Sequence, residues 1–137
     1  MSTIQISLRA GQRIYLNGAV IRADRKVTLE LMNDATFLLE GHILQAHETH
    51  TPLRQLYYVV QTMLMDPEAA ERTREVFRKM YADTHTAFVS PIIQNGLAKV
   101  ATMVEGGRTF DALRTLRLLF PMEDATLSTE SRPAHAA

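Results

Sequence analysis

The chain has 137 residues, 46% of them hydrophobic and 22% charged, so it can bury the core of one ordinary domain and need not be disordered. Fifteen basic and fifteen acidic side chains balance each other, which excludes a global field that attracts nucleic acid or membrane. The absence of cysteine excludes disulfides, thiolate metal sites and a cysteine nucleophile. Any attraction to a charged partner must therefore come from local clustering.

No segment has the pattern of a signal peptide or a membrane span. The first ten residues alternate apolar and polar side chains, whereas a signal peptide has a continuous apolar run. No stretch approaches the roughly 18 uninterrupted apolar residues of a membrane-spanning helix. We therefore expect a cytoplasmic protein without a membrane partner.

The first forty residues have the period-two hydropathy of short β-strands. Asn17-Gly18 separates two apolar alternations, and this is the strongest short-range hairpin signal, because a type I′ turn needs positive φ at both central residues. Turn residues at 10–11, 24–25 and 33–34 divide the remainder of this region. The predicted strands cover about 3–8, 13–16, 19–23, 27–31 and 36–39.

A two-residue turn fixes the register of the hairpin. The predicted pairs are Leu16 with Ala19, Tyr15 with Val20, Ile14 with Ile21 and Arg13 with Arg22. The apolar set, Ile14, Leu16, Ala19 and Ile21, is expected to face the core. On the other face, two directly opposed arginines repel unless an anion or a carboxylate lies between them. The next strand is expected to pair with the hairpin through a three-residue loop that places Ile21 opposite Val27.

Beyond a polar linker, the hydropathy period changes from two to 3.6 residues, which is typical of amphipathic helices. Thr51-Pro52 and Ser90-Pro91 each combine an N-cap with proline at the first helical position. Gly106-Gly107 is expected to end the third helix, and the fourth is expected to stop before Pro121. The four predicted helices begin after Thr51, at Glu68, at Pro91 and at Thr109, and they end near Asp66, Phe88, Gly106 and Leu119.

These elements predict an α+β fold, in which a small antiparallel β-sheet or partly open barrel of about five short strands precedes a bundle of about four helices. The predicted organisation is a β-region over 1–46 and a helical region over 51–122, packed as one unit. Residues 123–137 are polar and rich in small side chains, and we expect a disordered tail there. Free edge strands could also pair two copies of the chain in a homo-oligomer.

Five basic side chains gather in the β-region against a single acid in the first 29 residues, Asp24, which gives a local net charge of +4. The candidate RNA-binding residues are Arg9, Arg13, Tyr15, Arg22, Arg25 and Lys26. Guanidinium groups beside an aromatic ring suit single-stranded RNA, because cations hold phosphates and a ring stacks on an unpaired base. The alternative, which spacing alone favours, is a solvated face whose arginines pair with Glu30, Asp34 or Glu40.

Other candidate sites carry weaker signals. His42, His47, Glu48 and His50 lie in the polar linker at a spacing that matches no standard ligand pattern, so we expect no metal site and no cofactor. No phosphate-binding glycine loop, HExxH or GxSxG motif occurs, and the acids are scattered, so we expect a non-enzymatic protein rather than a nuclease.

Aromatic and methionine side chains of the first predicted helix could bind a protein partner, since thioethers repack around varied surfaces. Tyr57 and Met63 are expected to fill the core instead. Tyr58 and Met65 are the candidate partner-binding residues.

Three segments have the order and motifs of a known family: LNGAVIRADRKVTLELMNDATFLLEGHIL, TPLRQLYYVVQTMLMDPE and GRTFDALRTLRLLFPMED. Their landmarks are Asn17-Gly18-Ala19, Asn33-Asp34-Ala35, Thr51-Pro52 and Gly107-Arg108. From about Ile4 to Asp124 the chain resembles the FlbT family, the flagellar biosynthesis repressors of alphaproteobacteria. Residues 71–104 match only in helical character.

The resemblance implies a post-transcriptional regulator that acts on flagellin messenger RNA through its 5′ untranslated region and lowers its translation or stability. Some family members instead favour flagellin synthesis. The resemblance also implies a functional link to FlaF, a small flagellin-associated partner, and it supplies no catalytic or RNA-contact residues. The alternative is a protein-binding module that senses flagellin or FlaF and affects the message indirectly, which the neutral charge and large helical apolar content favour.

Overall fold

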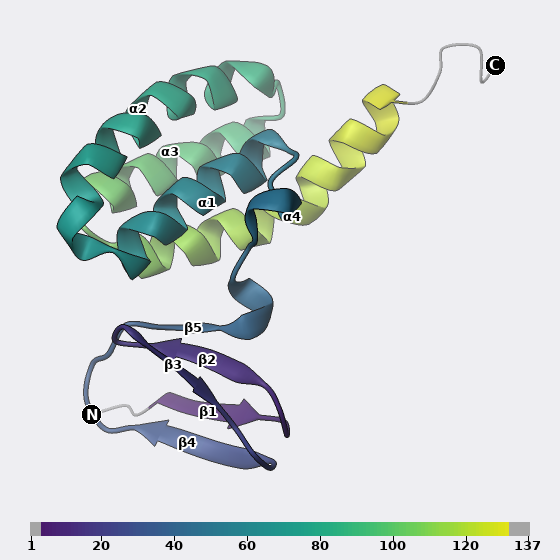
Figure 1. Ribbon diagram of the computed structural model, residues 1–137. Helices are drawn as coiled ribbons and strands as arrows, with labels where there is room; N and C mark the ends of the chain where they lie inside the picture. Colours follow the sequence, from purple (N-terminus) through teal and green to yellow (C-terminus); the bar gives the residue numbers. More distant parts are fainter. Residues whose placement is uncertain (1–3, 132–137) are drawn as a thin grey trace. The chain divides into compact units, whose positions relative to one another are not determined.

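A computed structural model describes residues 4–131, with side chains described to residue 128. The chain divides into two compact units, one ending at Ile43 and one beginning at Leu44. In the described residues, five strands form the first unit and four α-helices form the second (Figure 1), which confirms the predicted α+β class. None of these helices is long and apolar enough to cross a membrane.

The strand unit contains two antiparallel sheets rather than one. Its strands are β1 (Ile4–Leu8), β2 (Arg13–Leu16), β3 (Ala19–Arg22), β4 (Val27–Leu31) and β5 (Phe37–Leu39). One sheet pairs β1 with β4, and the other places β2 between β3 and β5. The β2–β3 register is the predicted one, with Arg13 opposite Arg22. Asn17 and Gly18 have φ values of 48° and 90°, as the predicted turn requires.

The predicted pairing of Ile21 with Val27 is wrong, because β4 pairs with β1. Val27 lies opposite Leu8, and Leu29 lies opposite Ile6. In this long-range pairing every apolar side chain of β1 lies opposite an apolar side chain of β4, and every polar one opposite a polar one, so both strands turn one apolar face to the core. The loop over 23–26 therefore crosses from one sheet to the other.

The core of the strand unit lies between these strands. Its buried members are Ile6, Leu8, Ile14 and Ala23, with partly buried side chains of β4 and β5 packed against them. Every residue of β3 is exposed, and Ile21 remains 40% exposed. The expectation that Ala19 and Ile21 face the core is therefore wrong, because β3 is an edge strand and the central strand β2 supplies the core contact through Ile14.

The helical unit contains α1 (Pro52–Met65), α2 (Ala70–Ala87), α3 (Pro91–Glu105) and α4 (Thr109–Ser131), with single 3₁₀ turns at Ala46–Glu48 and Pro67–Ala69. The predicted caps form, since the Thr51 and Ser90 hydroxyl oxygens accept hydrogen bonds from the backbone N–H of Arg54 and Ile93.

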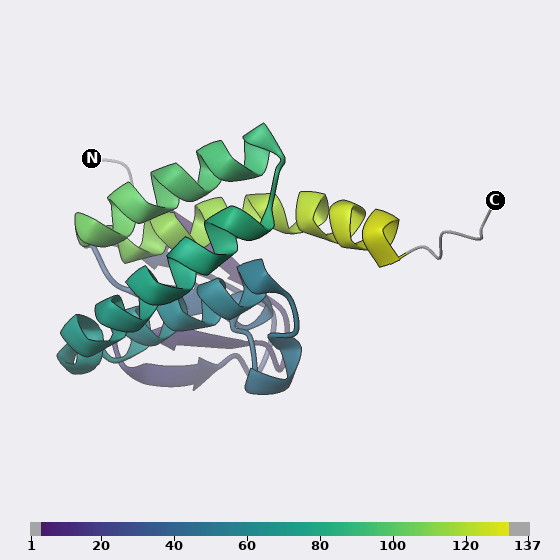
Figure 2. The same cartoon turned by 90° about the horizontal axis from the view of Figure 1, so that it is seen from above.

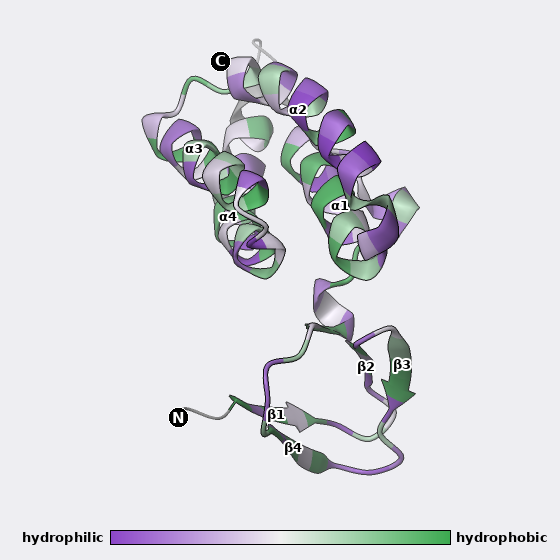
Figure 3. Cartoon of the chain, turned by 90° about the vertical axis from the view of Figure 1, so that its left-hand side faces the viewer, coloured by the Kyte–Doolittle hydropathy of each residue, from purple (hydrophilic) through white to green (hydrophobic). Residues whose placement is uncertain are grey.

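Helix α4 packs against both α1 and α3, and α2 packs against α1 (Figure 2). The exposed side of α2 is the most hydrophilic part of this unit (Figure 3).

Helix α4 does not stop before Pro121 as predicted. It continues through this proline to Ser131, so the expected disorder over residues 123–131 is wrong, and residues 132–137 lie outside the described part. Figure 1 shows the last turns of α4 extending past the other helices. An interior proline costs about 3 kcal/mol in a helix, so contacts made beyond Pro121 must offset that cost.

Glu123 makes those contacts, and its side chain is completely buried. One carboxylate oxygen accepts hydrogen bonds from the Thr51 hydroxyl at 2.7 Å and from Arg54 Nη1 at 2.9 Å. The other oxygen accepts from the backbone N–H of Leu53 at 2.6 Å. The Glu123 carboxylate thus lies at the positive end of the α1 dipole and accepts from a first-turn N–H group that has no partner within the helix. We call Thr51, Arg54 and Glu123 the α1–α4 anchor.

Neighbouring side chains extend this contact along both helices. The Arg54 guanidinium also binds Asp124, with nitrogen–oxygen distances of 2.9 and 3.2 Å, and lies 4.4 Å from the centre of the Phe120 ring. Arg117 donates to the hydroxyl of buried Tyr57 at 3.0 Å. Polar groups buried here are therefore paired, which is the condition for a buried charge to be tolerated.

A second set of charges joins α2 to α3 at the surface. Arg78 donates through two nitrogens to the two carboxylate oxygens of Glu105, at 2.7 and 2.9 Å. The Arg78 hydrogen bond lowers the pKa of Glu105 below its ordinary value, and Glu105 correspondingly raises the pKa of Arg78.

Replacing Glu123 should destabilise the helical unit strongly. Glu123→Ala leaves the Thr51 hydroxyl and the backbone N–H of Leu53 without their acceptor, and it leaves the largely buried Arg54 with Asp124 as its remaining carboxylate partner among the described residues. We expect a loss of about 3 kcal/mol in the free energy of unfolding. Glu123→Gln keeps one acceptor and should lose less. Urea denaturation checks this, with Asp124→Ala as the control, because Asp124 is 58% exposed and its pair with Arg54 contributes about 0–1 kcal/mol. An equal effect of both alanine variants would contradict the anchor's role.

The Arg78–Glu105 pair should make stability depend on pH in the acidic range. Because the pKa of Glu105 is lower in the folded chain, its contribution is complete above the ordinary value of 4.5 and is lost as the pH falls through the folded value. Glu105→Gln should therefore lower stability at neutral pH and converge with the parent chain in acid. Urea titrations across this range test the effect, and Glu68→Gln, an exposed acid on a different turn, should show no such convergence.

Candidate nucleic-acid interface

Two loops of the strand unit lie side by side and gather the predicted cations at one end. The backbone N–H of Gly11 donates to the carbonyl of Ala23 at 2.7 Å, and the Ala23 N–H donates to the carbonyl of Gln12 at 3.0 Å. These bonds join the loop between β1 and β2 to the loop between β3 and β4. The basic end, as we call it, comprises the five cations in or beside these loops: Arg9, Arg13, Arg22, Arg25 and Lys26.

Arg13 already has a carboxylate partner in the strand unit. Its Nε lies 2.9 Å from one oxygen of Glu40, and its backbone N–H donates to the other oxygen at 3.3 Å. Glu40 is one of the three acids expected to relieve the repulsion between Arg13 and Arg22. Both side chains are well exposed, at 62% and 43%, so this pair is open to competition by another anion.

Arg25 forms a second exposed pair with its neighbour Asp24. Two guanidinium nitrogens contact the two carboxylate oxygens at 3.2 and 2.9 Å. The hydrogen bond from Arg25 lowers the pKa of Asp24 below its ordinary value. This pair lies fully in solvent, where ion pairs contribute little to stability.

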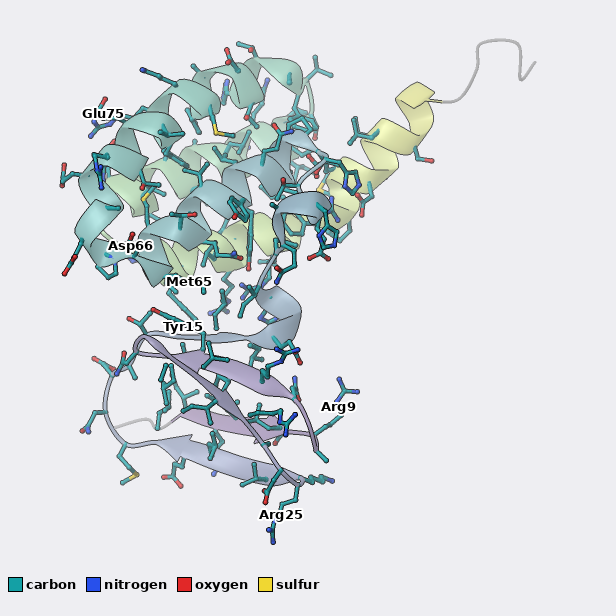
Figure 4. The ribbon with its side chains drawn as sticks, viewed as in Figure 1. Arg9, Tyr15, Arg25, Met65, Asp66 and Glu75 are labelled. Atoms are coloured by element: carbon teal, nitrogen blue, oxygen red, sulfur yellow. The ribbon has the colours of Figure 1, made fainter. Side chains whose placement is uncertain are left out.

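The other three cations of the basic end remain available. Within the described part of the chain, the side chains of Arg9, Arg22 and Lys26 have no carboxylate at ion-pair distance, and all three residues are exposed. Arg9 and Arg25 both extend into solvent at the loop end (Figure 4). The structure thus brings together residues up to 17 positions apart in sequence, from 9 to 26, and leaves a net positive charge on one small surface.

Tyr15 does not belong to this surface. It lies two residues along β2 from Arg13, toward the hairpin tip, opposite Val20 and Leu38. Its side chain is 7% exposed, and Figure 4 shows it away from Arg25. Base stacking needs a free ring face, so Tyr15 has no part in the interface proposed below.

The other candidate residues from the sequence lie outside the basic end. Tyr57 and Met63 are buried, which confirms their assignment to the core, while Tyr58 is 37% exposed and Met65 is half-buried. The Glu48 carboxylate accepts from the backbone N–H of Gln45 and so caps its own short turn. No metal-binding group of three histidine or acidic side chains occurs among the described residues.

Comparison with known proteins places this arrangement in a family. The family model described as "Flagellar protein FlbT" matches residues 4–127. The chain belongs to the FlbT family. This match spans the strand unit and nearly all described residues of the helical unit, so the basic end and the α1–α4 anchor both lie within the FlbT-family region.

Individual relatives agree with this assignment, and each is named "Probable flagellum biosynthesis repressor protein FlbT". The relative from Brucella anthropi is 50% identical over 128 residues, covering 93% of this chain and 84% of its own. That from Allorhizobium ampelinum is 47% identical over 129 residues, with coverages of 94% and 87%. That from Brucella ovis is 51% identical over 122 residues, with coverages of 89% and 80%. No solved structure matches the chain.

Proposed function

We propose that this chain is a post-transcriptional regulator of flagellin synthesis, which binds the 5′ untranslated region of flagellin messenger RNA through its basic end. The observation that carries the proposal is a group of three exposed cations in or beside adjoining loops, Arg9, Arg22 and Lys26, which have no ion-pair partner among the described residues. Membership of the FlbT family and the names of its relatives as flagellum biosynthesis repressors support the regulatory role.

The chemistry of the basic end suits a flexible, single-stranded ligand. Exposed guanidinium and ammonium groups on loops can hold phosphates, whereas the surface offers no helix to enter a groove. Two more cations, Arg13 and Arg25, are neutralised only by exposed carboxylates that a phosphate could displace. Binding through phosphates gives affinity without sequence readout, so recognition of one leader would also depend on the shape of its unpaired segments.

Regulation would follow from occupation of the leader rather than from chemistry on the RNA. A protein bound before the start of the coding region would block ribosome access or change exposure to nucleases in the cytoplasm. FlaF or flagellin would then modulate this binding through the helical unit, where Tyr58 offers exposed aromatic surface. No catalytic residue or cofactor is required.

Removing two unpaired cations should weaken RNA binding. For the double variant Arg22→Ala with Lys26→Ala, we expect about tenfold lower affinity for flagellin leader RNA. The slope of log affinity against log salt concentration should also fall by about 0.7 for each lost phosphate contact. Fluorescence anisotropy over a salt series measures both quantities.

A charge-matched control separates this effect from net charge alone. Arg72→Ala with Lys79→Ala removes the same two residue types from exposed positions of α2 and should leave both quantities unchanged. Unchanged RNA binding in the folded Arg22 and Lys26 variant would overturn the assignment. If the parent chain binds leader RNA no better than unrelated RNA but binds purified FlaF or flagellin tightly, it acts on the message indirectly.

Removing the competing carboxylates should have the opposite effect. Asp24→Asn with Glu40→Gln frees Arg25 and Arg13, and it raises the charge of the basic end by two. We expect roughly threefold to tenfold tighter leader binding and a steeper salt dependence. Because both pairs are exposed, the double variant should lose little stability. Weaker or unchanged binding in anisotropy measurements would show that these cations do not face the RNA.

A further inference from the structure

Helices α3 and α4 form an antiparallel pair whose contact line is defined by two short distances. A Cβ atom added to Gly96 would lie 2.7 Å from a terminal carbon of Leu119, so the helices approach closely there. One end of the pair is marked by the Thr115 hydroxyl, 3.5 Å from the sulfur of Met103. Residues that flank this line on the same side of both helices therefore share one surface.

Helical spacing identifies the residues on that surface. Residues three, four or seven positions apart lie on the same side of a helix. On α3 the residues at these offsets from Gly96 are Ile92 (four before), Lys99 (three after) and Met103 (seven after). On α4, Leu118 and Met122 lie three and seven residues after Thr115. We call Ile92, Met103, Leu118 and Met122 the outer α3–α4 face.

This face is apolar but not buried. Ile92 is 60% exposed and Leu118 is 71% exposed, and both methionines are half-buried. Single exposed apolar residues are ordinary, whereas adjacent ones along two packed helices mark an interaction surface. Flexible thioethers beside aliphatic side chains can repack around a helical partner.

Two basic side chains lie at the edges of the outer α3–α4 face. Lys99 lies on the α3 side, and Arg114 lies one turn before Leu118 on the α4 side. Both are exposed, and in the described residues neither has a carboxylate at ion-pair distance, although the nearby Arg108 is paired with Asp111. The free charge at this rim is therefore positive.

We propose that the outer α3–α4 face binds an amphipathic helix of another protein, whose apolar stripe is flanked by acidic residues. Apolar side chains of that helix would lie along Ile92, Leu118 and Met122, and its carboxylates would meet Lys99 and Arg114. A second copy of this chain is a poorer occupant, because a two-fold contact brings these cations toward their own copies. RNA is also a poorer occupant, since the face offers no aromatic ring for stacking.

Synthetic helical peptides test this proposal on the full chain. One stapled peptide has leucines at i, i+3, i+4 and i+7 flanked by glutamates, and a second has lysines in place of the glutamates. We expect the acidic peptide to bind in fluorescence anisotropy and the basic peptide to bind at least about tenfold more weakly. Leu118→Asp should weaken the acidic peptide by about tenfold or more, and Lys99→Ala with Arg114→Ala should reduce the difference between the peptides.

Controls keep the test decisive. Val76→Asp places the same charge at another exposed apolar residue, on α2, and should leave peptide binding unchanged. Circular dichroism confirms that each variant is folded, and Leu118→Asp should leave binding of leader RNA unaffected. The proposal is overturned if the acidic peptide does not bind, or if it binds equally to Leu118→Asp. Self-association of the parent chain in sedimentation, abolished by Leu118→Asp, would instead assign the face to a second copy.

Discussion

The helical unit depends on one buried carboxylate. Glu123 accepts hydrogen bonds from the first turn of α1 and from Arg54, and every donor involved is otherwise unsatisfied or largely buried. These bonds hold α4 against α1 and draw the chain past Pro121 as helix. The Glu123 carboxylate therefore caps the N-terminus of α1, although it belongs to a helix far along the chain. Because α4 also packs against α3, its position determines which residues lie on the outer α3–α4 face.

The main constraint on the strand unit is the repulsion between like charges at the basic end. The β2–β3 register requires Arg13 and Arg22 to face each other, and Glu40 relieves only one of them. Hydrogen bonds between the two loops add Arg9, Arg25 and Lys26 to the same end. Such a surface costs stability unless an anion binds, and in a member of the FlbT family the anion we propose is flagellin leader RNA.

The sequence correctly predicted the turns and helix caps that are determined by residues adjacent in the chain. Asn17-Gly18 gave the hairpin register, and Thr51 and Ser90 gave two helix starts, because each rests on backbone geometry within a few residues. The pairing of β4 with β1 and the passage of α4 through Pro121 depend on partners far along the chain. Likewise, the sequence places five cations close together along the chain. The folded loops show that Arg13 and Arg25 have carboxylate partners, whereas Arg9, Arg22 and Lys26 have none within residues 4–128.

The central claim is that flagellin leader RNA contacts the loop end of the strand unit. Ultraviolet crosslinking of the purified full chain to leader RNA, followed by mass spectrometry of the crosslinked peptides, locates the contact directly. The account predicts crosslinks within residues 9–26 that are lost in competition with unlabelled leader but persist with unrelated RNA. Crosslinks confined to the helical unit, or equal competition by any RNA, would contradict it.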